Sequence, residues 1–331
     1  MKPSIEYKTS GGVTIHKIPV QAFPGWLVNS YLILDDKPSL IDPGTPFSTA
    51  ALESGLKNIG FELEDVERCI ITHAHFDHFM LAGHVKEKSG AAIYTHVADV
   101  DNICSPVEKH DEYHARFDLV AAREGMSPEF LKEKNEREKD RESQFIQLLE
   151  GLDLQVDRPV SDKIGGYEVI HTPGHSPGHI CLVVDDFIFL GDHILSATTP
   201  HQMPTDFGDG YGLKNYLDSL EKVRQEAQTK KYHGLAGHED DVPDVAKRAA
   251  DIERFHKKRL DNILSLCKKE KTAWEITDEY YIRINELEGN KVDIKGQEAM
   301  ALTEILAHIE YLSYQGKLES TERDGIKYYK A

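Results

Sequence analysis

Residues 66–78, VERCIITHAHFDH, hold the feature that decides the fold. A short apolar run is followed at once by three histidines and an aspartate in the pattern H-x-H-x-D-H, at His73, His75, Asp77 and His78. Side chains two residues apart on an extended segment point the same way, and a helix that begins near Asp77 would turn the last two toward a neighbouring position. The string therefore predicts two adjacent metal positions at the end of a buried strand.

Two metal ions need further ligands, and three candidates follow other predicted strands. His175 lies in the loop HTPGHSPGH (residues 171–179), Asp192 follows the apolar run FIFLG, and His238 follows the stretch YHGLAG. Because rigid strands can aim side chains from the loops at their ends, we expect these groups to converge on the H-x-H-x-D-H string. Imidazole and carboxylate donors suit zinc, our first choice, and also iron or manganese.

The rest of the chain reads as an α/β protein. Short β-rich runs alternate with turns over residues 13–43, which predicts an antiparallel meander. Residues 45–59 have helical spacing and precede the strand at 66–72. After Gly151, β signals return in GYEVIHTPG and in HICLVVDDFIFLGD, which predicts a hairpin that turns at Asp185-Asp186.

Two segments stand apart from this pattern. Residues 105–150 are charged and helical, with a solvated face predicted over 132–142; they form either a surface insertion or a lid over the metal site. Residues 246–331 read as three helices, one of them behind a Thr cap, followed by a hairpin, which is the order of a winged helix. We therefore predict a catalytic domain over 1–245, insertion included, and a winged-helix domain over 246–331.

Composition limits the partners and the location. The chain has 331 residues and a net charge of −18, and residues 251–331 carry only −2, which argues against nucleic acid or an anionic membrane as partners. The composition is compatible with a homodimer. The four cysteines form no C-x-x-C pair, and no apolar run resembles a signal or a membrane helix, so we expect a cytoplasmic location.

Over roughly residues 12–242 the chain resembles the metallo-β-lactamase superfamily in its H-x-H-x-D-H string, its T-P-G-H-S-x-G-H loop, its G-D after a strand and its late G-H. The resemblance implies an αβ/βα sandwich with two metal ions at one edge between the sheets. It implies Asp42 as a residue that orients ligands by hydrogen bonds. The implied ligand sets are His73, His75 and His175 for one ion, Asp77, His78 and His238 for the other, and Asp192 bridging both.

The resemblance also narrows the chemistry. True β-lactamases of this superfamily usually have cysteine or serine in place of Asp192, whereas an aspartate there is similar to hydroxyacylglutathione hydrolases, lactonases and nucleases. Two metal ions lower the pKa of a shared water to about 7, so a bridging hydroxide can attack an electrophilic centre. We predict a hydrolase of a small acyl substrate, first a thioester such as an acyl-CoA or acyl-glutathione, with a phosphodiesterase, an endoribonuclease or a lactonase as alternatives.

Further site residues are predicted around this centre. Asp77 and Asp192 are expected to take part in catalysis as well as in metal binding. His179 and His201 are candidates for contacts with ligands or substrate. Trp26 could line the mouth of the site, although core packing is the simpler role for it.

Overall fold

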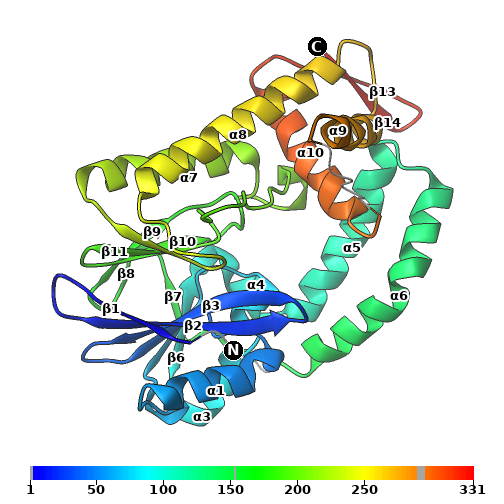
Figure 1. Ribbon diagram of the computed structural model, residues 1–331. Helices are drawn as coiled ribbons and strands as arrows, with labels where there is room; N and C mark the ends of the chain where they lie inside the picture. The colour runs from blue at the N-terminus through cyan, green and yellow to red at the C-terminus, as the bar shows by residue number, and fades with distance from the viewer. Residues whose placement is uncertain (1–2, 153, 289–294) are drawn as a thin grey trace. The chain divides into compact units, whose positions relative to one another are not determined.

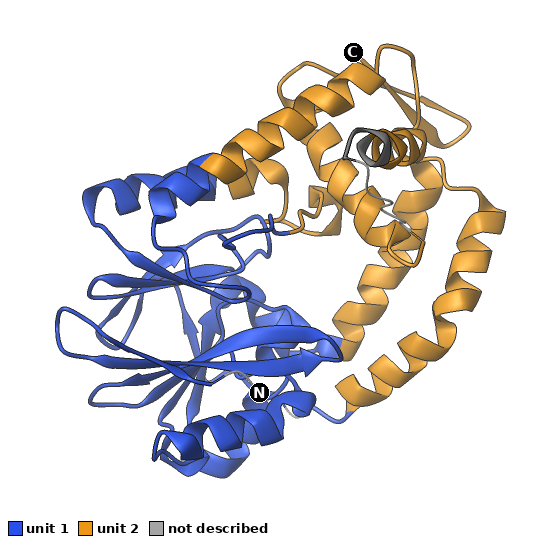
Figure 2. Cartoon of the chain, viewed as in Figure 1, with its two compact units in different colours: residues 1–106, 151–200, 218–250 blue, residues 107–150, 201–217, 251–331 orange. Residues whose placement is uncertain are grey.

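The computed structural model describes residues 3–152, 154–288 and 295–331. The chain forms two compact units, coloured separately in Figure 2. Unit 1 comprises Met1–Pro106, Gly151–Pro200 and Asp218–Ala250, and unit 2 comprises Val107–Glu150, His201–Leu217 and Asp251–Ala331. The helical insertion (residues 107–150) thus belongs to the same unit as the C-terminal helices. Its position in the sequence, inside the predicted catalytic domain, did not indicate this grouping.

The first sheet of unit 1 has the strand order β1 to β7. Strands β1 to β4 pair antiparallel, which confirms the predicted meander, and β4 to β7 pair parallel. The strands are β1 (Ile5–Lys8), β2 (Thr14–Phe23), β3 (Trp26–Leu34), β4 (Ser39–Ile41), β5 (Arg68–Ile70), β6 (Ala92–His96) and β7 (Arg158–Val160). The long β2–β3 hairpin projects beyond its neighbours and ends at the turn before Trp26 (Figure 1).

The second sheet has the order β12-β11-β10-β9-β8, with β11 and β12 parallel. Its strands are β8 (Lys163–Ile164), β9 (Tyr167–His171), β10 (Ile180–Val184), β11 (Phe187–Gly191) and β12 (His233–Ala236). The predicted hairpin at Asp185-Asp186 is confirmed, and Asp185 has the positive φ of 53° that such a tight turn requires.

The core of unit 1 lies between the two sheets. Apolar side chains from both inner faces form one buried cluster, in which Tyr31 packs against Phe189 with ring centroids 5.2 Å apart. Helices α1 (Thr49–Asn58) and α3 (Ala82–Ser89) cover the outer face of the first sheet, and residues 218–229 of α7 (Leu213–Thr229) cover the second (Figure 1). This arrangement confirms the predicted αβ/βα sandwich.

Short helical turns occupy the connections of the sandwich and of unit 2. They are η1 (Pro46–Ser48), η2 (Leu63–Asp65), α2 (Phe76–Phe79), η3 (Val97–Asp99), α4 (Val100–Cys104) and η4 (Thr205–Phe207). Among these, α2 begins inside the H-x-H-x-D-H string, because His75 is still extended and Phe76 is the first helical residue.

The described part of residues 246–331 has three helices followed by a hairpin, in the predicted order, and unit 2 also contains the two helices of the insertion. Its elements are α5 (Pro106–Arg123), α6 (Pro128–Glu150), α8 (Val245–Leu266), α9 (Ala273–Glu288), α10 (Glu298–Tyr314), β13 (Glu319–Arg323) and β14 (Ile326–Lys330), of which α5 and α8 begin in unit 1. The predicted Thr cap of α9 is present, because Thr272 Oγ1 accepts the Glu275 N–H and Glu275 returns the bond to the Thr272 N–H.

The insertion packs into the interior of unit 2. Glu124 accepts a hydrogen bond from the Tyr329 hydroxyl at 2.8 Å, and the ring of Phe130 lies 5.3 Å from that of Trp274. Arg137 forms an ion pair with Glu298 at 2.7 Å. The insertion therefore supplies part of the core beneath the C-terminal helices.

One prediction for the insertion was wrong in part. Residues 132–142 were expected to be solvated, but Lys134 and Glu138 are buried and form an i,i+4 ion pair at 2.9 Å. The Lys134 ammonium also lies 4.9 Å from the ring centroid of Phe117. A charged stretch can bury its inward-facing pair when the partners neutralise each other.

No helix among the described residues combines the length and the apolar character needed to cross a membrane.

Candidate metal centre

The predicted ligands converge because they follow strands that end at one edge of the sandwich. Asp42 follows β4, His73 follows β5, and the loop carrying His175 follows β9. Asp192 follows β11 and His238 follows β12. Parallel pairing of β4 with β5 and of β11 with β12 brings the carboxyl ends of these strands to the same edge, so the structure brings all seven predicted side chains together.

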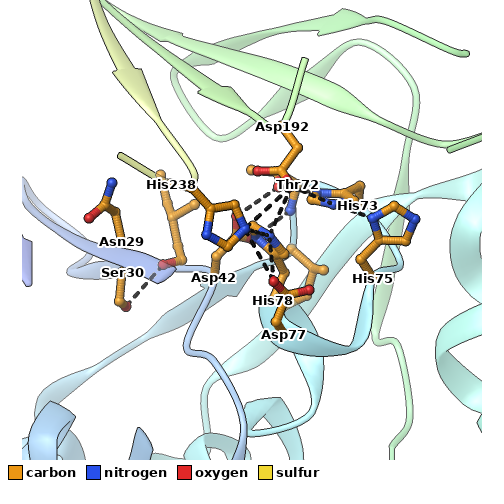
Figure 3. A network of polar contacts seen from close by, with 12 residues as sticks. Asn29, Ser30, Asp42, Thr72, His73, His75, Asp77, His78, Asp192 and His238 are labelled. Carbon is orange, nitrogen blue, oxygen red and sulfur yellow. Dashed lines mark hydrogen bonds and ion pairs between the residues drawn. The ribbon is translucent and has the colours of Figure 1, made fainter. Parts of the chain in front are cut away.

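One carboxylate oxygen lies at the centre of the cluster. Asp192 Oδ2 is 3.4 Å from His238 Nε2 and 3.6 Å from His78 Nε2. The same oxygen is 3.8 Å from His73 Nε2 and 3.7 Å from His175 Nε2. Figure 3 shows Asp192 above the histidines of both halves of the cluster. A single oxygen is thus equidistant, within a few tenths of an ångström, from four imidazole nitrogens.

The side chains around Asp192 divide into two groups. In the first, His73 Nε2 lies 3.1 Å from His75 Nδ1, and the ring of His175 lies 4.3 Å from that of His75. In the second, His238 Nε2 lies 3.2 Å from His78 Nε2 and 3.1 Å from Asp77 Oδ2. The ligand atoms within each group are within 4.8 Å of one another, close enough to surround one ion.

Hydrogen bonds from the opposite side of each ring orient the histidines. His78 Nδ1–H donates to Asp42 Oδ2 at 2.9 Å, which directs Nε2 toward the cluster. His73 Nδ1–H donates to Thr72 Oγ1 at 3.0 Å, and that hydroxyl donates to Asp42 Oδ2 at 2.7 Å. His238 Nδ1–H donates to the Leu27 carbonyl at 2.5 Å. One buried carboxylate, Asp42, thus orients a histidine in each group.

Electrostatics at the cluster favour a cation. Although burial disfavours the charged form, His78 and a hydrogen bond with His238 hold the pKa of Asp77 well below its usual range. Burial likewise opposes protonation of His238, yet Asp192 and Asp77 raise the pKa of His238 to about 10. The carboxylates therefore attract positive charge to the nitrogens of the second group.

The first group presents neutral nitrogens. Burial and the neighbouring His175 lower the pKa of His75 to about 3, and burial with His78 and His75 holds the pKa of His73 well below its usual range. His73 Nε2 and His75 Nδ1 lie 3.1 Å apart, so His75 Nδ1–H donates to His73 Nε2 here, and a metal ion bound between them would replace that proton. The Oδ1 atom of Asp192 is buried and has no hydrogen-bond partner in the part of the chain that the structure describes. A divalent cation would satisfy this oxygen and bind the imidazole nitrogens around it, so the residues fit the metal ions that the sequence predicts.

The two further histidines occupy different surroundings. His179 is fully buried; its Nε2 accepts the Asp192 backbone N–H at 3.1 Å, and its Nδ1–H donates to Thr172 at 2.7 Å. It therefore fixes the backbone of the central aspartate. His201 belongs to unit 2, where its Nε2 lies 3.1 Å from both the Met300 carbonyl and the Thr303 hydroxyl. A substrate role for His201 stays a prediction.

Sequence reasoning misplaced Trp26. Its side chain does not pack in the core but is 55% exposed, and its Nε1–H donates to Asp77 Oδ2 at 3.1 Å. Phe23 pairs with Trp26 across the β2–β3 turn, and Phe47, 58% exposed, has its ring 6.1 Å from that of Phe23. Leu27, beside Trp26, is also exposed. The Pro24-Gly25 pair in the sequence is typical of a turn, and it indicates that Trp26 lies at the tip of a hairpin and not in the core.

Unit 2 contains a second cluster of buried polar groups, formed by His256, Glu304 and His308. The His256 Nδ1 and His308 Nε2 atoms are 3.0 Å apart, and Glu304 forms an ion pair with Arg259. Glu304 also accepts the Gln202 N–H at 2.7 Å. The carboxylate is already neutralised by a guanidinium, which disfavours a metal ion and favours a hydrogen-bonded polar network.

Comparison with known proteins places these features in context. The model of the metallo-beta-lactamase superfamily matches residues 23–228. A probable metallo-hydrolase of Methanocaldococcus jannaschii is 27% identical over 217 residues, which cover 64% of this chain and 90% of the relative. An N-acyl homoserine lactonase of a Bacillus species is 29% identical over 130 residues, or 39% of this chain and 37% of the lactonase. The crystal structure of a β-lactamase domain protein from Burkholderia ambifaria superposes with a TM-score of 0.76 at 22% identity, covering 100% of this chain and 96% of that one, and so shares the fold.

Proposed function

The chain belongs to the metallo-β-lactamase superfamily of hydrolases, and from this premise we propose that it binds two divalent metal ions and hydrolyses a small acyl substrate. The observation that carries the proposal is the position of Asp192 Oδ2, within 3.4–3.8 Å of four histidine nitrogens. An oxygen in that position can be shared by two ions, each held by one of the two groups around it.

We assign His73, His75 and His175 to one ion and Asp77, His78 and His238 to the other, with Asp192 shared. Zinc is the preferred metal, because imidazole and carboxylate donors suit it, and the same donors also accept iron or manganese. When bound, two such ions would supply hydroxide at neutral pH by lowering the pKa of a water shared between them.

The side chains of the cluster have distinct tasks in this proposal. Asp77 is ionised at neutral pH, so its carboxylate can accept a hydrogen bond from the attacking water and orient it, but cannot donate a proton. The Trp26 indole fixes one oxygen of that carboxylate. Asp42 and His179 hold the ligands from behind, through His78 and through the Asp192 backbone. Catalysis is therefore assigned to Asp77 and Asp192, with the others positioning them.

An acyl thioester is the first candidate substrate. Trp26, Leu27 and Phe47 expose apolar surface around the tip of the β2–β3 hairpin, where Trp26 touches the metal cluster, and an aliphatic acyl chain fits such a surface. A lactone is the second candidate, supported by the similarity to an N-acyl homoserine lactonase, and it needs the same attack on a carbonyl carbon. The acidic charge of the chain counts against a phosphodiesterase acting on RNA.

Two further parts of the proposal concern the C-terminal domain and the location. We propose that residues 246–331 form a winged-helix domain that supports an oligomer, in the simplest case a homodimer, rather than binding nucleic acid. We propose a cytoplasmic location. Because the insertion at 105–150 packs in unit 2, deleting it would remove core contacts of the C-terminal helices.

The test is a substrate screen of zinc-reconstituted protein. Acyl-CoA and acyl-glutathione thioesters, N-acyl homoserine lactones and bis(p-nitrophenyl) phosphate are offered to the wild type, to His175→Ala and to the control His114→Ala, whose histidine lies on α5. We expect hydrolysis of a thioester or a lactone that is lost in His175→Ala and kept in His114→Ala. Hydrolysis of the phosphodiester alone would contradict the proposed substrate class.

A further inference from the structure

A buried carboxylate outside the metal cluster joins the two loops that carry the first group of histidines. Asp99, at the end of η3, is fully buried. Its Oδ2 accepts the Ala74 backbone N–H at 2.9 Å and the Ser176 hydroxyl at 2.8 Å. Its Oδ1 accepts the Gly178 backbone N–H at 2.7 Å. Three donors from two distant loops thus meet on one side chain.

Each donor stands next to a residue of the metal cluster. Ala74 lies between His73 and His75, so its peptide sets the path of both side chains. Ser176 directly follows His175. Gly178 directly precedes His179, which in turn holds the backbone of Asp192. The distance between the two loops is therefore fixed through Asp99.

The sequence of the second loop is adapted to this contact. A Cβ atom placed on Gly178 would lie 2.6 Å from Asp99 Cγ and 2.7 Å from the Asp99 backbone nitrogen. Such distances are well inside van der Waals contact, and the second one involves backbone that cannot easily move. A glycine at 178 is thus what allows the peptide to reach the carboxylate.

The contact also requires a carboxylate rather than an amide. All three partners of Asp99 donate hydrogen bonds to it, and two of them are backbone N–H groups, which can donate but cannot accept. An asparagine would turn its own NH₂ toward one of these N–H groups and leave it unsatisfied. Hydrogen bonds to a charged acceptor are also stronger than those to a neutral one.

We propose that Asp99 is a positioning residue that sets the affinity of the first metal position, formed by His73, His75 and His175, far more than that of the second, which it reaches only through His179 and the backbone of the shared Asp192. The second position is held from elsewhere, by Asp42 behind His78 and by the Leu27 carbonyl behind His238. The inference rests on the two-metal centre proposed above. It predicts a selective loss of one ion, which a general structural role for Asp99 would not produce.

The experiment measures the affinity of each ion. Full-length wild type, Asp99→Asn, Gly178→Ala and the control Asp101→Asn, an exposed aspartate two residues along, are loaded with zinc and titrated with a chromophoric chelator, while thermal unfolding is followed in parallel. We expect one of the two ions to bind about 10- to 100-fold more weakly in Asp99→Asn and in Gly178→Ala, and the affinity of the other to change far less. Asp101→Asn should bind both ions as the wild type does.

A double variant and Ser176→Ala test whether the weakened metal binding comes from the Asp99 contact itself. Gly178→Ala added to Asp99→Asn should weaken binding little beyond the single variants, because both remove the same contact. Should Asp99→Asn fail to fold, Ser176→Ala, which removes one of the three donors, should still weaken one ion selectively. Equal weakening of both ions, or unchanged binding of both in folded variants, overturns the proposal. A wild type that binds fewer than two ions instead counts against the proposed function.

Discussion

The indole Nε1–H of Trp26 donates a hydrogen bond to Asp77 Oδ2 at 3.1 Å, although the two residues are 51 positions apart in the sequence. The ring of Trp26 also lies edge-on to His238, with centroids 5.4 Å apart. A largely exposed aromatic residue at the tip of a hairpin is thus tied to the second group of predicted ligands. It joins the surface that would meet the substrate to the atoms that would perform the chemistry.

Substitutions of Trp26 should separate these two roles. Trp26→Phe loses the N–H but keeps an aromatic face, whereas Trp26→Ala loses both. For a substrate with an aliphatic acyl chain, we expect Trp26→Ala to raise KM roughly tenfold, which corresponds to about 1.4 kcal/mol of lost apolar contact, and Trp26→Phe to raise it much less. Steady-state kinetics on both variants test this. Equal KM values in the wild type and Trp26→Ala would show that the indole does not meet the substrate.

Asp42 should matter to the second metal position most directly. Its carboxylate accepts the Thr72 N–H, the Thr72 hydroxyl and the His78 Nδ1–H, and an asparagine cannot accept all three. We expect Asp42→Asn to weaken metal binding about 10- to 100-fold and to lower the free energy of unfolding by about 1–3 kcal/mol. Chelator competition and urea unfolding measure the two effects, with Asp65→Asn, an exposed aspartate of η2, as control. Wild-type affinity in Asp42→Asn would be incompatible with the role assigned to it.

Removal of metal should destabilise unit 1. Without a cation, a single hydrogen bond at 3.1 Å between the rings of His73 and His75 stands where an ion would be held by both. An ion present at 1,000 times its dissociation constant stabilises the folded state by about 4 kcal/mol, which for a unit of this size raises Tm by roughly 10 °C. We expect a chelator to lower Tm by about that amount and added zinc to restore it. Calorimetry with identical melting curves before and after chelation would contradict the prediction.

The buried histidines of unit 2 should make its stability sensitive to acid. Burial lowers the pKa of His308 to about 4 and, together with His308, holds the pKa of His256 well below its usual range. The groups around them are Glu304, whose pKa is lowered to about 2, and the neighbouring Arg259 and His201. Between about pH 6.5 and 4 the unfolded chain therefore binds more protons than the folded one, so the stability contributed by these histidines is complete above pH 6.5 and is lost as the pH falls through this range.

Urea unfolding at pH 7 and pH 5 measures this loss. In His308→Gln, which keeps a polar side chain but no titrating ring, the free energy of unfolding should fall less between the two pH values than in the wild type. An equal fall in both proteins would place the acid sensitivity in other groups.

The sequence predicted the sandwich and the seven clustered side chains because both depend on local signals. Apolar runs marked the strands, and each candidate ligand directly followed one of them, as His73 follows β5 and Asp192 follows β11. Asp99 carried no such signal. It lies in a short turn after β6, and its importance comes from two loops, at Ala74 and at Ser176 to Gly178, that only the folded chain brings together.

The grouping of the insertion could not be predicted for a similar reason. The apolar stripe of residues 105–150 indicates that one face is covered but not which element covers it. Contacts such as Glu124 with Tyr329 join segments 205 residues apart. The buried pair of Lys134 and Glu138 was hidden within a charged stretch, because a sequence does not show which charges face inward.

The central claim is that a centre of two metal ions performs hydrolysis. The most direct test is to titrate metal-free protein with zinc. Bound metal is measured by elemental analysis, and hydrolysis of the best substrate from the screen is measured in the same samples. We expect activity to rise until two ions are bound per chain. In His75→Ala, metal content should fall and activity should drop by orders of magnitude, since the remaining ligands of that ion are left mispositioned. Fewer than two ions per reconstituted wild-type chain, or unchanged metal content in His75→Ala, would contradict the account.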